Sequence, residues 1–245
     1  MVSLFNIKFS NLTLKETIEI IDSNIRNNIK TIYMDINTDK IVYAYENNYM
    51  FDIINSCDIV NPDGMAVFWA SKFLGKPLKE RIAGVDLFVE LIKVSAEKGY
   101  RIYFLGAKQE VLEKMIKNIK EKFNNEIIAG YRNGYFEENE EERIVEMIND
   151  SGAEILFIGI TSPKKELFIE RNRDKLNVNF IMGVGGSFDV LAGHIKRAPI
   201  WVQKIGMEWL YRVYQEPRRL WKRYAVSNSK FIKIFLLELL KNKKK

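Results

Sequence analysis

Residues 154–189 read EILFIGITSPKKELFIERNRDKLNVNFIMGVGGSFD. The stretch opens with a short apolar run at 154–160 and closes with another at 180–184. Between the two runs, residues 163–175 have the apolar spacing of a helix, which would begin at a proline. A strand, a helix and a second strand in succession form a crossover, so this stretch predicts two parallel strands of one sheet.

The same alternation of short apolar runs and helical patterns extends from residue 31 to residue 195. It predicts strands at 31–36, 58–60, 101–105, 126–129, 154–160 and 180–184. It predicts helices at 39–49, 84–98, 108–123, 138–149 and 163–175, and one that begins near Met65. We therefore expect a Rossmann-like α/β fold, with a mainly parallel sheet and helices on both faces. Ligands of such sheets bind beyond the carboxyl ends of the strands.

The last fifth of the chain differs from the rest in pattern and in charge. It lacks strand runs, so we divide the chain into a core, 1–195, and a helical appendage, 196–245. The appendage has 14 Lys and Arg against 3 Glu, a charge of +11, whereas the core has 24 against 29 acidic residues, or −5. A basic segment on an acidic body indicates an anionic partner.

Three interpretations of the basic appendage are open. It could be a solvated helical face, or it could bind nucleic acid, since arginines alternate with aromatic residues. The apolar run at 231–240, followed by lysines, favours the third, an anionic membrane surface, over nucleic acid. No run is long enough to span a bilayer and no secretory signal opens the chain, so we expect a cytoplasmic protein on the inner face of the cell membrane. The single cysteine, Cys57, fits that reducing compartment.

Several predicted strands end in motifs that suit a ligand site. The motif Asn61-Pro62-Asp63-Gly64 follows the strand at 58–60. Turn chemistry alone explains such a motif, but a carboxylate at a strand end can also serve as a general base. Glycine-rich strand ends allow a phosphate to approach the backbone, and they occur at 104–107, 159–164 and 183–189.

Other site chemistries find little support in the sequence. The 183–189 motif lacks the last glycine of a dinucleotide fingerprint, because Phe188 occupies that position. Ser162 is the expected N-cap of the helix that follows it. With His194 as the only histidine and with no Asp-x-Asp pair, we expect neither a metal site nor a cofactor.

Taken together, these elements resemble the WecG/TagA/CpsF family of glycosyltransferases over nearly the whole chain. The matching elements are 36–40 (INTDK), 62–64 (PDG), 81–87 (RIAGVDL), 134–136 (GYF), 162–166 (SPKKE), 183–189 (GVGGSFD), 193–199 (GHIKRAP) and 208–212 (EWLYR). The resemblance implies transfer of a sugar from UDP to an undecaprenyl-diphosphate-linked sugar, with inversion and without a metal. The sugar is typically N-acetylmannosamine or its uronic acid, as in the linkage unit of wall teichoic acid.

The resemblance leaves alternatives open. Some family members act in capsule or exopolysaccharide synthesis with other donor sugars. A non-catalytic sugar-nucleotide-binding module or membrane adaptor is the rival from another class. A further partner to test is a second copy of the chain, which would bind through apolar surface that the appendage otherwise covers.

The resemblance also implies roles for individual residues. Asp63 is the expected base, and Arg212 and Arg219 are expected to stabilise the leaving diphosphate. The further expected substrate contacts are Asp35, Asn37, Arg81, Gly106, Ser162, Lys165, Gly185, Gly186, Asp189, Lys222 and Arg223. Asp35 and Lys165 depart from the family pattern, which has threonine and glutamine there, so they bear on sugar specificity.

Overall fold

The computed structural model describes residues 1–123 and 125–242, with the side chains of residues 125, 219 and 242 left out of the description. The chain forms two compact units. Unit 1 comprises Met1–Leu14, Met34–Ala83 and the described part of Lys196–Lys245. Unit 2 comprises Lys15–Tyr33 and Gly84–Ile195. One break between the units falls at the predicted boundary after residue 195, but the division into core and appendage stays a prediction.

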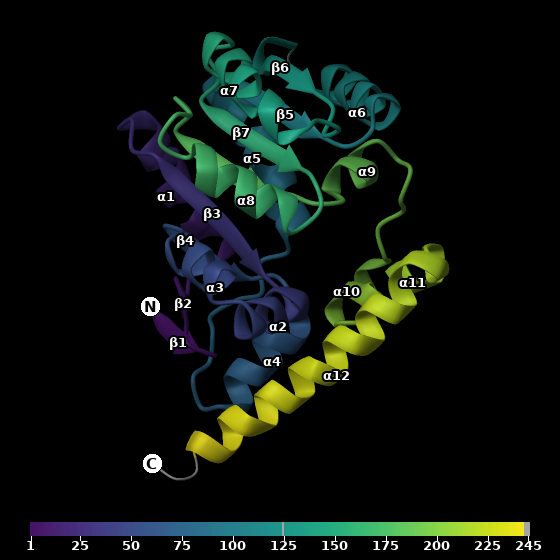
Figure 1. The fold of residues 1–245 in the computed structure, drawn as a ribbon. Coiled ribbons are helices and arrows are strands. Elements are labelled where there is room, and N and C mark those ends of the chain that lie inside the picture. Colours follow the sequence, from purple (N-terminus) through teal and green to yellow (C-terminus); the bar gives the residue numbers. More distant parts are fainter. Residues whose placement is uncertain (124, 243–245) are drawn as a thin grey trace. The chain divides into compact units, whose positions relative to one another are not determined.

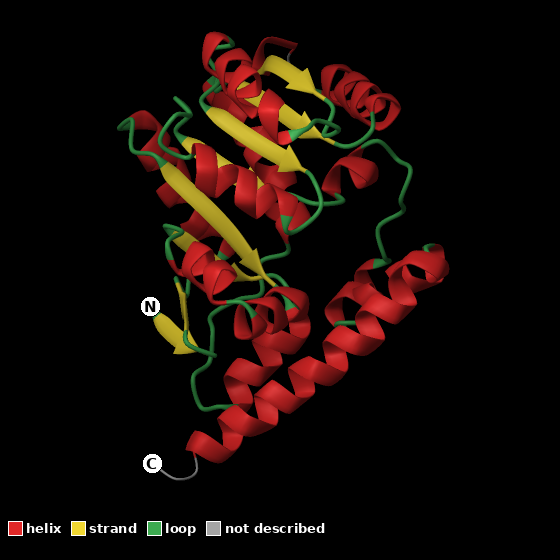
Figure 2. Ribbon diagram, viewed as in Figure 1, coloured by secondary structure: helices red, strands yellow, loops and turns green. Residues whose placement is uncertain are grey.

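The main sheet has six strands in the order β4-β3-β8-β7-β5-β6, drawn as yellow arrows in Figure 2. The pairings that link β3, β8, β7, β5 and β6 are all parallel, which confirms the predicted α/β class. The first half of β3 pairs with β8 in unit 2, and its second half belongs to unit 1. The strands are β3 (Thr31–Ile36), β4 (Ile59–Pro62), β5 (Ile102–Gly106), β6 (Ile128–Arg132), β7 (Ile155–Gly159) and β8 (Phe180–Gly183).

Unit 2 is built around a cluster of buried aromatic rings. Phe88 from α5 packs edge-to-face on Phe157 of β7, with ring centroids 4.7 Å apart, and Phe104 and Phe188 complete the cluster. Helices α5 and α8 cover opposite faces of these strands (Figure 1). The helices and 3₁₀ turns of unit 2 are α1 (Leu14–Arg26), α5 (Gly84–Lys98), α6 (Gln109–Lys122), η1 (Asn125–Ile127), η2 (Glu138–Glu140), α7 (Glu141–Asp150), α8 (Lys164–Asn172) and α9 (Ser187–Leu191).

In unit 1 the long helix α12 packs against other elements of the unit. Its Phe231 ring lies 5.6 Å from the Phe5 ring, and its Phe235 ring lies 6.4 Å from the Phe73 ring. Helix α12 begins at Pro217 and runs beside α2 (Figure 1). The elements of unit 1 are β1 (Val2–Leu4), β2 (Ile7–Phe9), α2 (Thr38–Glu46), α3 (Asn48–Asn55), α4 (Met65–Phe73), α10 (Ile200–Lys204), α11 (Glu208–Gln215) and α12 (Pro217–Asn242).

The structure corrects three details. The predicted helix 39–49 is two helices, because Asn47 ends α2 and caps α3 with its side-chain oxygen. The N-cap of α8 is Pro163 and not Ser162, whose hydroxyl contacts side chains instead. The antiparallel β1–β2 hairpin was not predicted.

Candidate active site

Asp63 follows β4 directly, at the carboxyl end of that strand. Its backbone N–H donates to the carbonyl of Ile36 over 2.9 Å, which joins it to the end of β3. The Arg81 guanidinium donates to the Asp63 carbonyl over 3.4 Å. Asn37, next to Ile36, caps α2 by accepting the Lys40 N–H over 3.0 Å. The predicted base, Asn37 and Arg81 therefore lie together in unit 1, at the strand ends where a ligand is expected.

Asp35, on β3, forms a largely buried ion pair. The Lys40 ammonium lies 2.7 Å from the Asp35 carboxylate and also donates to the Asp35 carbonyl over 2.8 Å. Only 8% of the Lys40 side chain is exposed. The Asp35 carboxylate therefore compensates a buried cation, and removing either partner would leave the other charge buried and unpaired.

Helix α11 is tied to the loop that carries Arg81. Its first residue, Glu208, lies 3.6 Å from the Arg81 guanidinium and 3.4 Å from that of Arg197. Arg81 thus connects the Asp63 backbone with α11. Arg212 lies one turn further along this helix, so the anchoring of Glu208 also sets the position of that arginine.

Tyr224, on α12, lies among the charged groups of this site. Burial raises the pKa of Tyr224, while Arg212 and Arg223 lower it and Asp39 and Asp63 raise it. The phenol therefore stays protonated at neutral pH, and the predicted base and two predicted cations all lie within electrostatic reach of it. The sequence offered no signal for Tyr224, because only packing shows which face of α12 turns toward Asp63.

The remaining predicted cations also lie on α12. Arg223 forms an ion pair with Asp39, with its Nε 2.7 Å from the carboxylate. Lys222 lines a pocket beside Arg223. The side chain of Arg219 is outside the described set, so its prediction has no structural counterpart here.

In unit 2, close packing accounts for Gly106, and a left-handed backbone conformation accounts for Gly185. Gly106 has a φ of +145°, and a Cβ on it would lie 2.5 Å from the backbone of Gly159. Gly185 has a φ of +51° with open space around it, and Gly186 is the N-cap of α9. The Asp189 carbonyl accepts N–H bonds from the chain that follows α9. The glycine-rich strand ends are thus close to one another in unit 2, as parallel pairing requires.

Lys165 and Glu166 form a second buried ion pair, at the start of α8. Their charged atoms lie 3.0 Å apart, and the two side chains are 7% and 1% exposed. The Ser162 hydroxyl lies 2.6 Å from the Lys165 ammonium and 2.8 Å from the Glu166 carboxylate. The Lys165 cation is therefore compensated within its own motif.

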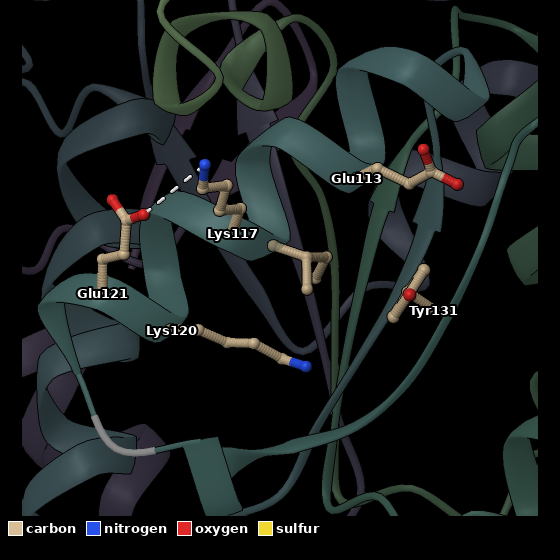
Figure 3. Close-up of a pocket in the computed structure, with 6 residues that line it drawn as sticks. Glu113, Lys117, Lys120, Glu121 and Tyr131 are labelled. Carbon is tan, nitrogen blue, oxygen red and sulfur yellow. Dashed lines mark ion pairs between the residues drawn. The ribbon is translucent and has the colours of Figure 1, made fainter.

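The predicted residues thus fall into two groups. Unit 1 holds Asp35, Asn37, Asp63, Arg81, Arg212, Lys222 and Arg223, and unit 2 holds Gly106, Ser162, Lys165, Gly185, Gly186 and Asp189. A surface pocket of about 430 Å³ between α6 and β6 contains none of them (Figure 3). Across the described ranges, no three His, Cys, Asp or Glu side chains converge as metal ligands would.

The chain matches known proteins along its length. Residues 2–245 match the family described as "Glycosyl transferase WecG/TagA/CpsF family". A relative from Bacillus spizizenii is 33% identical over 218 residues, which cover 84% of this chain and 84% of the relative. A relative from Bacillus subtilis is 32% identical over 243 residues, or 99% of this chain and 93% of the relative. Both are named N-acetylglucosaminyldiphosphoundecaprenol N-acetyl-beta-D-mannosaminyltransferase.

The α/β fold and these matches define the chain as a glycosyltransferase. It belongs to the WecG/TagA/CpsF family, which confirms the resemblance seen in its motifs.

Proposed function

We propose that this enzyme transfers N-acetylmannosamine, or a related hexose, from UDP to an undecaprenyl-diphosphate-linked sugar. The reaction would serve cell-surface polymer synthesis of the wall teichoic acid linkage-unit type. The observation that carries the proposal is the shared name of two relatives that match most of the chain. The name states both the sugar that those relatives transfer and the lipid-linked acceptor.

The mechanism that suits this site is a single inverting displacement. Asp63 accepts the proton of the acceptor hydroxyl, whose oxygen attacks the anomeric carbon of the donor sugar. The bond from that carbon to the diphosphate oxygen breaks on the opposite face, so UDP leaves with additional negative charge. Arg212 and Arg219, with Arg223 as a third cation, neutralise that charge without a metal ion.

We propose five further substrate contacts. Gly106, Gly185 and Gly186 let a phosphate approach the backbone, and Ser162 and Asp189 supply polar groups. Asp35 and Lys165 each belong to a buried ion pair, as described above. They therefore influence sugar choice through the position of their partners more than as free charges.

The proposal is tested by a transfer assay in the presence of EDTA. We expect UDP release from UDP-N-acetylmannosamine when an N-acetylglucosamine-diphosphate-lipid acceptor is added, with the rate unchanged by the chelator. UDP-glucose and UDP-N-acetylglucosamine serve as comparison donors. A preference for either would point to capsule or exopolysaccharide synthesis, and sugar-nucleotide binding without turnover would point to a non-catalytic module. Inhibition by EDTA that Mg²⁺ reverses would contradict the metal-free mechanism.

We further propose that the 196–245 appendage holds the 1–195 core at the inner face of the cell membrane. The described part of the appendage exposes large apolar side chains on three helices beside its basic residues. They include Ile200, Trp201, Ile205, Tyr214, Trp221, Ile232, Leu236, Leu237 and Leu240. Apolar groups beside lysines and arginines suit an anionic lipid surface. None of the helices in the described ranges combines the length and hydropathy of a membrane span.

Leu240→Glu is expected to weaken binding to anionic phospholipid vesicles by about tenfold or more, because an inserted leucine contributes about 1.5–3 kcal/mol. The measurement is co-sedimentation with vesicles at fixed ionic strength. Ser229→Glu, an exposed polar position on the same helix, makes the same charge change and is the matched control.

Equal effects of the two substitutions would contradict insertion of the apolar face. Two other results would redirect the assignment of this surface. Salt-dependent binding of DNA or RNA that outcompetes vesicles would favour nucleic acid. Oligomers that Leu240→Glu dissociates in the absence of lipid would favour self-association.

A further inference from the structure

Helices α2 and α12 line an open surface groove of about 360 Å³ in unit 1, here called the α2–α12 groove. Figure 1 shows α12 running alongside α2. The groove is lined from α2 by Asp39, Val42, Tyr43 and Glu46, and from α12 by Lys222, Arg223, Val226, Ser227 and Lys230.

The cations of the groove outnumber its acids by one. Arg223 is paired with Asp39, and the Lys230 ammonium lies 2.7 Å from the Glu46 carboxylate. Lys222 has no ion pair with any side chain of the described residues. The groove therefore has a cation available for an anion, between two ion pairs that hold α12 to α2.

Ser227 lines the groove with a buried polar side chain. Its side chain is buried, with 8% of the residue exposed, and its hydroxyl has no hydrogen-bond partner among the described atoms. Buried hydroxyls are normally hydrogen-bonded. Val42, Tyr43 and Val226 provide apolar surface beside it. A ligand with an anionic oxygen next to a hydrocarbon chain matches this combination of groups.

The Asp39 end of the groove lies next to the candidate active site. Asp39 follows Asn37 by two residues, and the carbonyl of the preceding residue, Ile36, accepts the N–H of Asp63 over 2.9 Å. Beyond Lys230, α12 continues into its exposed apolar side chains. The groove thus lies between the predicted base and the surface proposed to meet lipid.

We propose that the α2–α12 groove binds the diphosphate and the adjoining hydrocarbon of the lipid-linked acceptor. Lys222 and Ser227 would contact a phosphate, and the chain would lie against Val42 and Val226 on its way to the bilayer. The assignment of this ligand as the acceptor rests on the proposed function. The position of Asp39, just after the segment that binds the Asp63 backbone, favours the acceptor over a membrane phospholipid.

The test compares Val226→Glu with Ala225→Glu. Both positions are exposed on α12, and both variants change the charge equally, but only Val226 lines the groove. The probe is farnesyl diphosphate, a diphosphate on a short prenyl chain, titrated by calorimetry without membranes. We expect Val226→Glu to weaken its binding by about tenfold, since a carboxylate beside the ligand repels its charge, and Ala225→Glu to change it less than about twofold.

Kinetics and vesicle binding complete the test. We expect Val226→Glu to raise KM for the lipid-linked acceptor by about tenfold, with kcat and the donor KM changed less than about twofold. Equal effects of the two variants, or no effect of either, would overturn the proposal. If Val226→Glu impairs vesicle binding more than Ala225→Glu and leaves farnesyl diphosphate binding unchanged, the groove binds a phospholipid and the proposal is likewise wrong.

The experiments distinguish an error in the ligand assigned to the groove from an error in the proposed function. A wild-type enzyme that transfers sugar, and whose Val226→Glu variant binds both ligands normally, would overturn the groove alone. A wild-type protein that binds farnesyl diphosphate in the groove and transfers no sugar from any UDP donor would overturn the proposed function. The groove would then stand as a prenyl-diphosphate site.

Discussion

Replacing Asp63 with asparagine is expected to lower kcat by about 10²–10⁴-fold, the usual contribution of a positioned general base. The amide has nearly the same shape but cannot accept the proton of the acceptor hydroxyl. The Asp63 backbone contacts with Ile36 and Arg81 do not involve the carboxylate and would persist. The protein should therefore stay folded, and donor binding should change little.

The measurement is steady-state kinetics of UDP release, accompanied by circular dichroism and thermal unfolding. Asp58→Asn is the matched control, because it makes the same change at an exposed position just before β4, at the other end of that strand. Near-normal turnover of Asp63→Asn would remove Asp63 from the role of base. Asp39 would then be the next carboxylate to test, since it raises the pKa of Tyr224 as Asp63 does.

The fold was largely predictable because buried parallel strands appear in sequence as continuous apolar runs. The strand predicted at 31–36 has the bounds of β3, and the helix predicted at 84–98 has those of α5. The β1 and β2 strands are three residues each, too short for a period to be recognised. The break at Asn47 depends on its capping hydrogen bond, which a count of apolar residues does not detect.

The position of Asp63 in the fold was predictable from local chemistry. A Pro-Asp-Gly turn after an apolar run placed Asp63 at a strand end, where the structure has it. Contacts between distant segments were not visible in the sequence. The Glu208 contact with Arg81 spans a long stretch of chain, and the compensation of Lys165 by Glu166 depends on how the start of α8 packs.

Replacing Arg212 with alanine is expected to lower kcat by about 10²–10³-fold, because one preorganised donor to a developing negative charge contributes that much. Arg212 and Arg223 both lower the pKa of the Tyr224 phenol, and Asp63 raises it. The positive charge of Arg212 and the negative charge of Asp63 therefore influence the same side chain. Arg212→Lys should restore part of the rate, since it keeps the charge and loses the planar fork of donors.

The effect should be on kcat more than on the acceptor KM, because the diphosphate gains its additional charge only as its bond to the anomeric carbon breaks. Arg218→Ala is the control, an exposed arginine at the start of α12 with the same loss of charge. A general weakening of membrane attraction would affect both variants equally. A specific loss of turnover in Arg212→Ala, with vesicle binding equal to that of Arg218→Ala, would separate leaving-group stabilisation from membrane recruitment. Equal kcat values in the two variants would instead leave Arg212 as one of the basic residues that attract lipid.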